Sequence, residues 1–565
     1  MRFSRNQDRI TALREEAEER DARRRAEAEG LPYLDLGVAT VDPDALTLVP
    51  EERERRAKAA PVELKEKRLK LAVYSPKLKE AEELVEDLGA KGYEVDLVVS
   101  SERGLEAVWG RYLKEPAATS RRKEIVSEAI LDEARFIEIQ QKVKSTAGAL
   151  QLLNQLKEAP TGELIESIWG AALVLEASDV HLEPRAEKEA TIRFRIDGML
   201  KEIGEIPIEQ AKLLTNRIKL FSNLKLNVTD APQDGRFTIG SSLGDIEVRT
   251  SIVPAEFGEA VVTRILNPKS IALDMPNLGF RHDDEKIIST VLKRPNGMIL
   301  VTGPTGEGKT TTLYAFLKRV KTSALKIITV EDPIEYHLSG IEQTEIDPET
   351  GYTFVAGLRS ILRQDPDIIL VGEVRDLETA EVAIHAALTG HLVFSTLHTN
   401  NASGAIPRLV DLGVKPGVIG PALALIVAQR LVRRLCPYCR QVFNIEELTR
   451  VKFEQFLKTL PRRVASASLN RELKIYRAGK GCDRCDEGYR GRIGIFEILE
   501  AGSYLDLLMK QGATETEIEE AARKKGMITI QEDGILKVLQ GITSLEEIER
   551  ASGPINWLEP LSSLK

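Results

Sequence analysis

A glycine-rich loop in the second half of the chain has the residue types and the spacing that hold a triphosphate. The apolar run 298–302 precedes the loop, and a helical pattern that opens at Thr311 follows it. Loop glycines let backbone N–H groups converge on phosphate oxygens, and the N-terminus of the next helix adds partial positive charge. This arrangement predicts a site for the phosphates of ATP. The loop residues are Gly303, Pro304, Thr305, Gly306, Glu307, Gly308, Lys309 and Thr310.

Two side chains of this loop would take part in the chemistry. Lys309 would bridge the β- and γ-phosphates, and the Thr310 hydroxyl would bind Mg²⁺. A chance glycine-rich loop is the alternative, but the order strand, loop and helix argues against it. We therefore predict that ATP and Mg²⁺ bind at residues 303–311.

Acidic residues follow two other apolar runs. Glu373 ends the run 367–372, and Gly372 stands where many ATPases with such a loop carry a magnesium-binding aspartate, so Glu373 must act alone on that strand. Glu331 follows the run 326–330. The carboxyl ends of parallel strands line the ligand crevice, so either carboxylate could orient the attacking water. The sequence leaves that choice open.

Four cysteines form two Cys-x-x-Cys pairs, and residues 440–481 lie between the pairs. Four thiolates give the tetrahedral shell that Zn²⁺ prefers in a closed structural site. A redox motif is the weaker alternative, because neither pair opens a helix after a strand as in thioredoxin. We predict zinc, with the ligands Cys436, Cys439, Cys482 and Cys485.

The bulk composition fits a globular protein of several domains. The chain has 565 residues, of which 42% are hydrophobic and 30% charged, and its net charge of -9 argues against a nucleic-acid wrapper. The longest apolar run, 416–428, is too short to span a bilayer and contains Pro421. Residues 1–9 are too polar for a signal peptide. We therefore expect a cytoplasmic protein in which any membrane contact is made through partners or a surface helix.

The remaining pattern places these sites in an α/β protein. Charged residues and alanines fill 8–29, which predicts a solvated helix or, as an alternative, a docking element. Strand and helix patterns follow within 69–99, then a charged helical stretch over 121–143. Strict alternation over 191–197 predicts a strand-rich region before the nucleotide-binding core. The expected domains are a charged N-terminus (1–30), an α/β docking domain (31–120), a helical linker (121–160), a strand-rich domain (161–275) and an ATPase domain (276–565) that includes the cysteine module (430–495).

Several motifs in order carry a resemblance to a known family. They are the run 178–184 (Ser-Asp-Val-His-Leu-Glu-Pro), the phosphate loop, an acidic box at 329–336, the strand ending at Glu373, and a histidine box at 388–400. Over residues 162–553 the chain resembles the type II secretion and type IV pilus assembly ATPases. The resemblance implies a RecA-like core with a zinc module, preceded by an α+β, PAS-like domain.

The resemblance also implies roles for individual residues. His391 and His398 would belong to the catalytic centre, both at the active edge of the sheet, whereas His181 would be structural or lie between domains. Arginines of the strand-rich domain would contact the nucleotide, and we favour Arg236, Arg249 and Arg264. Solvated strand faces and hydrogen-bonded histidines are the alternatives.

One residue departs from the family pattern. Glu307 stands in the phosphate loop where the family usually has serine. The backbone does most of the phosphate binding, so we expect the loop to tolerate a carboxylate. Its negative charge close to the phosphates is expected to weaken or slow nucleotide binding.

By resemblance, the expected function is that of a homo-hexameric motor that adds pilin or pseudopilin subunits through an inner-membrane platform protein. The N-terminal domain would bind a cytoplasmic or membrane-associated component of the machine. A pilus retraction motor, a nucleic-acid-translocating ATPase and a non-enzymatic scaffold are the alternatives. The cysteines and the N-terminal extension argue against the first, the acidic balance against the second, and the intact catalytic residues against the third.

Overall fold

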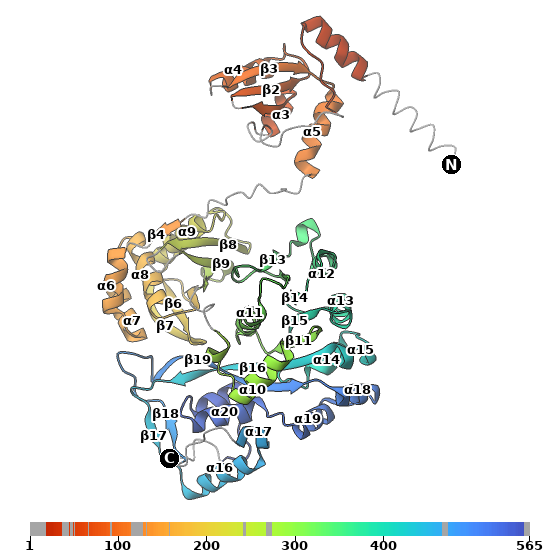
Figure 1. Ribbon diagram of the computed structural model, residues 1–565. Coiled ribbons are helices and arrows are strands. Elements are labelled where there is room, and N and C mark those ends of the chain that lie inside the picture. Colours follow the sequence, from red (N-terminus) through yellow and green to blue (C-terminus); the bar gives the residue numbers. More distant parts are fainter. Residues whose placement is uncertain are drawn as a thin grey trace. The chain divides into compact units, whose positions relative to one another are not determined.

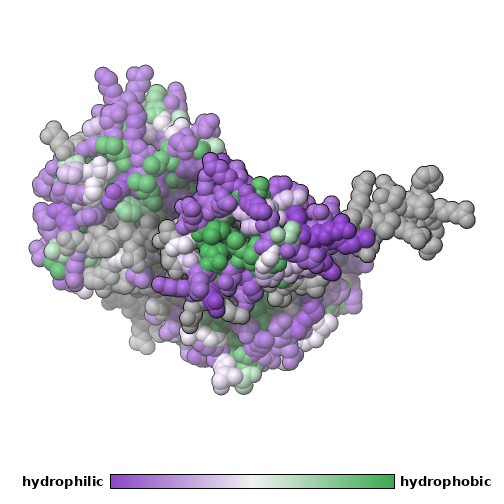
Figure 2. Space-filling view, turned by 90° about the horizontal axis from the view of Figure 1, so that it is seen from above, coloured by the Kyte–Doolittle hydropathy of each residue, from purple (hydrophilic) through white to green (hydrophobic). Residues whose placement is uncertain are grey.

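The computed structural model divides the chain into two compact units, Met1–Glu124 and Ile125–Lys565 (Figure 1). It describes residues 18–36, 45, 49, 51–65, 67–90, 93–114, 128–130, 133–156, 159–240, 245–266, 274–465 and 473–558. Figure 2 shows that hydrophilic residues dominate the face that it presents, as expected for a chain with 30% charged residues. No helix among the described residues is both long and apolar enough to cross a bilayer.

The smaller unit is a three-stranded sheet with helices. Strand β2 pairs antiparallel with β1 and parallel with β3, and buried apolar residues on both faces of the sheet form two small cores. This agrees with the predicted α/β character. The elements are α3 (Glu51–Ala57), β1 (Ala59–Lys65), β2 (Arg68–Val73), α4 (Lys79–Ala90), β3 (Glu94–Val99) and α5 (Glu102–Lys114).

The helix over residues 18–29 packs on this unit instead of standing in solvent. Ala22 and Ala26, four residues apart, are buried. The Arg25 guanidinium lies 3.8 Å from the centre of the Tyr74 ring. The prediction of a solvated helix is therefore wrong for this part, because two alanines on one helix face are enough to bury it. The first part of the predicted helix lies outside the described residues.

The larger unit begins with a seven-stranded sheet in the order β4-β8-β9-β10-β5-β6-β7. All neighbouring strands are antiparallel except β4 and β8. Its elements are β4 (Glu128–Ile130), α6 (Glu133–Lys142), α7 (Thr146–Gln155), α8 (Thr161–Val174), β5 (Asp179–Pro184), β6 (Glu189–Ile196), β7 (Met199–Pro207), α9 (Ile208–Phe221), β8 (Gln233–Gly240), β9 (Ile246–Ala255) and β10 (Gly258–Leu266).

Helices α6 and α7 belong to the core of this sheet domain and do not form a linker. Phe136 and Ile139 of α6, with Leu152 and Leu153 of α7, are buried in the same cluster as the sheet. Strand β4 also interrupts the helix predicted over 121–143. The apolar positions of these short helices are too few to show the difference in sequence.

A second seven-stranded sheet follows in the order β13-β12-β14-β15-β11-β16-β19, parallel except for β19. Alternate residues of its strands enter two separate clusters, one on each face, so helices cover both faces. Continuous apolar strands are typical of such a sheet. Its strands are β11 (Gly297–Thr302), β12 (Ile327–Glu331), β13 (Glu342–Glu345), β14 (Ile368–Val371), β15 (Leu392–Leu397), β16 (Leu423–Leu435) and β19 (Tyr489–Glu500).

Helices surround the second sheet, and a small module is inserted between β16 and β19. The surrounding helices are α10 (His282–Val291), α11 (Lys309–Val320), α12 (Phe354–Ile361), α13 (Leu377–Leu388), α14 (Ala405–Asp411), α15 (Pro416–Ala422), α18 (Ser503–Lys510), α19 (Glu515–Lys524), α20 (Ile530–Leu539) and α21 (Leu545–Ser552). The module contains β17 (Gln441–Phe443), α16 (Glu447–Thr459), α17 (Arg462–Ala465) and β18 (Ile475–Arg477).

Candidate active site and metal centre

The predicted phosphate loop connects β11 to α11 at the carboxyl edge of the second sheet. Gly303 has a φ of +152°, and a side chain there would meet the carbonyl oxygen of Gln429 at 2.6 Å. Gly306 and Gly308 also have positive φ, at +85° and +76°. These backbone conformations and the tight packing require glycine at the loop's turning points.

Lys309 lies at the centre of this loop. Its Nζ donates to the carbonyl oxygens of Gly303 at 2.8 Å and Pro304 at 2.9 Å. Burial lowers the pKa of Lys309, and the charges of Glu373 and Glu307 oppose that shift. The ammonium is thus held at the loop, where phosphate oxygens would be its stronger partners.

The order of the strands brings Glu373 and His398 beside the loop. From β12 the order runs through β14 and β15 to β11, so the end of β15 lies next to the end of β11 and the end of β14 lies one strand further away. Glu373 follows β14 and His398 follows β15, and His398 Nε2 lies 3.4 Å from Glu373 Oε2. Arg375 pairs with the other oxygen of Glu373. A carboxylate, an imidazole and an ammonium therefore lie at the same edge of the sheet.

Glu331 lies on the next strand, β12, in a very different environment. Only 3% of the residue is exposed. One carboxylate oxygen accepts hydrogen bonds from Thr329 and Gln343, and the other accepts from the Tyr314 hydroxyl. Burial and the neighbouring Glu331 charge raise the pKa of Tyr314, so this hydroxyl remains a donor. Glu331 is therefore fixed in a buried network.

His391 lies at the opposite edge of the sheet from the phosphate loop. The prediction that both histidines reach the active edge is therefore wrong. It precedes β15, whereas His398 follows the same strand, and a six-residue strand separates them. His391 contacts the carbonyl oxygen of Ala386 through Nδ1 at 3.0 Å, and its own carbonyl accepts from Gly297 at the start of β11. Opposite ends of one strand cannot line the same edge of a sheet.

The arginines predicted to contact nucleotide lie in one row across the first sheet. Arg236 is directly opposite Arg249, which is opposite Arg264, and the row continues through Asp179 to Arg195. Directly opposite residues project from the same face. The Asp179 carboxylate lies 3.0 Å from Arg264 Nε and 3.3 Å from Arg195 Nε. We call these five residues the arginine row.

One member of the arginine row reaches the second sheet domain. Arg249 Nη1 lies 3.1 Å from Glu335 Oε2, and its Nη2 donates to the Ile334 carbonyl at 2.7 Å. Both partners follow β12. The row is thus attached to the active edge through Arg249, while Arg236 and Arg264, on either side of Arg249, are exposed.

The sequence analysis missed two polar residues of β16. Gln429 Oε1 accepts from the Thr312 hydroxyl, and its Nε2 donates to the Glu307 carbonyl, both at 2.6 Å. Arg430 donates to Asn400 Oδ1 at 3.0 Å. The sequence did contain a signal for these two residues. They directly follow the long apolar run 416–428, just as Glu331 and Glu373 follow apolar runs.

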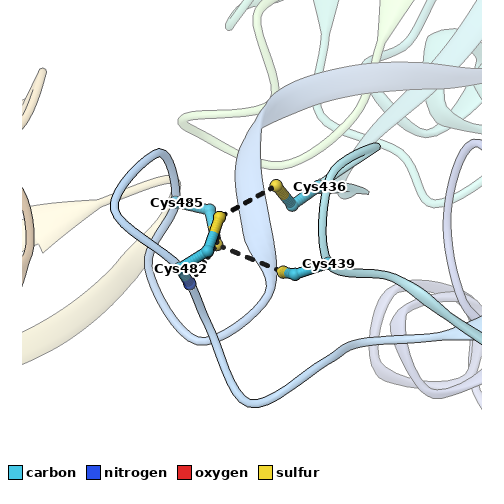
Figure 3. Close-up of side chains that lie close together, drawn as sticks. All are labelled: Cys436, Cys439, Cys482 and Cys485. Carbon is cyan, nitrogen blue, oxygen red and sulfur yellow. Dashed lines mark hydrogen bonds between the residues drawn. The ribbon is translucent and has the colours of Figure 1, made fainter.

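The four cysteines converge between two loops of the inserted module (Figure 3). Their sulfur atoms all lie within 4.8 Å of one another, with Sγ–Sγ distances of 3.6 to 3.8 Å for the nearest pairs. Such distances suit four thiolates around one tetrahedral ion. Cys436 and Cys485 are buried, which suits a closed site. The donor set therefore fits zinc.

Comparison with known proteins decides the family. The family model described as type II/IV secretion system protein matches residues 154–550. The chain belongs to this family. Residues 29–119 match the MshEN domain model, which lies within the smaller unit. The expectation of a secretion or pilus-assembly ATPase family is confirmed.

Relatives of this secretion-family chain fall into two groups. A type II secretion system protein E from Pseudomonas aeruginosa is 43% identical over 402 residues, which cover 71% of this chain and 77% of the relative. A type IV pilus assembly ATPase PilB from Myxococcus xanthus is 36% identical over 529 residues, which cover 93% of this chain and 89% of the relative.

A solved structure supports the fold. The ATPase DotB from Yersinia pseudotuberculosis superposes with a TM-score of 0.51 at 19% identity, over 70% of this chain and 95% of that chain. The secretion-family chain therefore has the predicted α/β architecture of the RecA-like secretion ATPases.

Proposed function

We propose that this chain is a hexameric ATPase motor that drives assembly of a type IV pilus or extension of a type II secretion pseudopilus. The observation that carries the proposal is the convergence of the phosphate loop, Glu373 and His398 at one sheet edge. The relatives named as pilus assembly and secretion ATPases support the machine. The pilus ATPase aligns with 93% of the chain, including the N-terminal unit, which favours the pilus.

In this proposal, ATP binds with its phosphates on the loop. Backbone amides of residues 303–309 and the Lys309 ammonium hold the phosphate oxygens. The Thr310 hydroxyl would bind Mg²⁺, and Glu373 would contribute to its shell; the ion would neutralise charge on the phosphates when bound. His391 takes no part within the chain, because it lies at the other edge.

Glu373 is the residue that we assign to water activation. Its carboxylate forms ion pairs with Arg375 and His398, whose side chains are 64% and 49% exposed. Glu331 has both oxygens committed to buried donors. A base must reach the water, so Glu373 polarises it and Glu331 stabilises the strand end.

The arginine row supports a site completed between subunits. Charge on the transferred phosphoryl group requires further cations, and Arg236 and Arg264 present theirs to solvent. A neighbouring subunit's nucleotide would be a further partner for these exposed guanidinium groups, and Arg249 connects the row to the loop after β12. Closure and reopening of the first sheet domain would then follow the nucleotide state.

The cysteine module and the N-terminal unit complete the proposal. Zinc on the four thiolates would close the module, a structural role. The N-terminal unit would dock on a cytoplasmic or membrane-associated component, and the motor would act on an inner-membrane platform protein. The protein would thus be cytoplasmic and peripheral to the inner membrane, without a nucleic-acid partner.

Phosphate release from magnesium ATP by the purified full-length chain tests this proposal. Glu373→Gln keeps the size of the side chain and is expected to lower turnover at least a hundredfold while nucleotide still binds. Glu381→Gln, on the exposed surface of α13, is the matched control. Saturable stimulation by DNA would favour the nucleic-acid motor, and unchanged turnover in Glu373→Gln would refute the assignment.

Pilus counts in a deletion strain separate the motors. An assembly motor predicts loss of pili, a retraction motor predicts that pili persist, and loss of secreted protein with normal pili points to secretion.

A further inference from the structure

Strand β16 runs past the end of β11, and beside the phosphate loop this edge of β16 pairs with no strand in the part of the chain that the structure describes; we call it the free edge of β16. The last pair of the two strands is Thr302 with Ala428, whereas β16 continues to Leu435 with β19 on its other side. A side chain at Gly308 would lie 3.1 Å from Gln429 Nε2, so the loop packs along this edge. Backbone N–H groups on such an edge need acceptors other than a strand.

Glu307 supplies the acceptor. Its carboxylate accepts a hydrogen bond from the backbone N–H of Leu431. Its carbonyl accepts from Gln429 Nε2 at 2.6 Å, and Gln429 Oε1 accepts from the Thr312 hydroxyl of α11 at 2.6 Å. The loop, the strand edge and the first turn of the helix are therefore tied together around one loop residue.

The surroundings of Glu307 compensate its charge. Burial lowers the pKa of Lys309 and of Arg430, and the Glu307 charge opposes both shifts. The carboxylate is therefore attracted by two neighbouring cations, and one of its oxygens accepts from the Leu431 N–H of β16. The Glu307 carboxylate is therefore hydrogen-bonded to β16, and it is not an unpaired anion that faces the phosphates.

We propose that Glu307 is a positioning residue that anchors the phosphate loop to the free edge of β16 and so strengthens nucleotide binding. The proposal rests on the proposed function, since it takes the loop as the nucleotide site. It reverses the expectation from sequence, in which the carboxylate weakens binding.

Titration of the full-length protein with a fluorescent ADP analogue tests the proposal. Glu307→Ala removes the acceptor and is expected to weaken affinity about tenfold, as for loss of a hydrogen bond to a charged group. Glu307→Ser should also weaken binding, whereas Glu307→Gln keeps an acceptor and should recover most of the loss. In turnover assays the KM for ATP should rise in Glu307→Ala with kcat changed less than threefold, because the anchor acts on binding.

Two further measurements separate anchoring from general damage. Hydrogen exchange should speed up in the loop peptide of Glu307→Ala but not in Glu381→Ala, an exposed control on α13. Gln429→Leu should weaken nucleotide binding as well. The double variant Glu307→Ala, Gln429→Leu should lose less binding free energy than the sum of the losses in the two single variants, because both residues hold the same loop.

The outcomes are distinct for each claim. Wild-type protein that binds no nucleotide would overturn the proposed function. Wild-type protein that binds nucleotide, with Glu307→Ala or Glu307→Ser binding as tightly or more tightly and with unchanged loop exchange, would overturn the anchor alone. If circular dichroism shows that Glu307→Ala misfolds, the anchor is tested instead by three other results. These are the affinities of Glu307→Gln and Glu307→Ser and the hydrogen exchange of the loop in Gln429→Leu.

Discussion

Glu331 and Glu373 follow neighbouring strands, yet their surroundings give them different tasks. Both were predicted from the same signal, a carboxylate after an apolar run. Their burial and partners depend on side chains far along the chain, such as Tyr314 and Gln343, and no local pattern reports those contacts. For the same reason, sequence alone could not reveal that Gln429 binds the loop.

The Glu331 network makes Tyr314 important for stability. Tyr314→Phe removes the donor to one carboxylate oxygen and leaves that oxygen buried without its partner. We expect a loss of about 1 to 3 kcal/mol in the free energy of unfolding and a much smaller fall in turnover than in Glu373→Gln. Thermal melting and phosphate release measure the two effects. An unchanged melting temperature would contradict the network.

Glu497 on β19 predicts a pH dependence of stability. It is 3% exposed, and burial raises its pKa to about 7 from 4.5. The folded state therefore binds the proton more tightly than the unfolded state, so this residue's contribution to stability is full below pH 4.5 and declines as pH rises to about 7. Glu497→Gln has no such titration and keeps an acceptor for the Ala402 N–H.

Urea unfolding at pH 5 and pH 8 measures this effect. Between these values, the wild type should lose about 2 to 3 kcal/mol relative to Glu497→Gln. Glu520→Gln, exposed on α19, is the control and should follow the wild type. A constant difference between the wild type and Glu497→Gln at both pH values would contradict the burial argument.

Elements are positioned by contacts that sequence periodicity shows only in part. Continuous apolar runs predicted β11, β12 and β14 of the second sheet correctly, because these strands are buried on both faces. The run 416–428 contains helix α15 and the start of β16 with no change in hydrophobicity, so the sequence pattern does not show where the helix ends and the strand begins. The short strand β4 could not be predicted, because its pairing with β8 is decided by distant residues.

The cysteine module also contacts the first sheet domain. The Thr146 hydroxyl donates to Asp486 Oδ1 at 2.6 Å, Lys201 Nζ lies 3.3 Å from Asp486, and the Gly491 N–H donates to Asp197 at 2.8 Å. These contacts begin directly after Cys485. The second cysteine loop therefore holds the β6–β7 hairpin, a contact that the spacing of the cysteines could not show.

Loss of the metal should loosen that hairpin. We expect Cys485→Ser, or treatment with a zinc chelator, to remove bound zinc and to speed hydrogen exchange in the peptide over 197–201. The reason is that the thiolates fix the loop that carries Asp486. Asp483→Ser, an exposed change in the same loop, should do neither. Zinc loss without faster exchange would contradict the coupling.

At the scale of the whole molecule, the chain consists of two units with separate cores. The smaller unit has its own sheet and buried clusters, and the larger unit contains every residue that we assign to ATP. The family motifs showed the larger unit well because most of them lie along the strands and the carboxyl edge of its second sheet. The N-terminal helix was misjudged because its buried face consists of alanines.

A shortened chain tests this division. The fragment 125–565 is expected to hydrolyse ATP within about threefold of the full chain, because no assigned catalytic residue lies before it. Phosphate release, with light scattering to compare oligomeric state, is the measurement. A folded fragment that assembles like the full chain but lacks turnover would show that the N-terminal unit takes part in catalysis.

The most direct test of the account is magnesium-dependent phosphate release by wild type and Lys309→Ala, side by side in the zinc-loaded full-length protein. The account predicts steady release by the wild type and a loss of at least a hundredfold in the variant, since Lys309 is the loop's cation for the transferred phosphate. Equal release by the two proteins would contradict it.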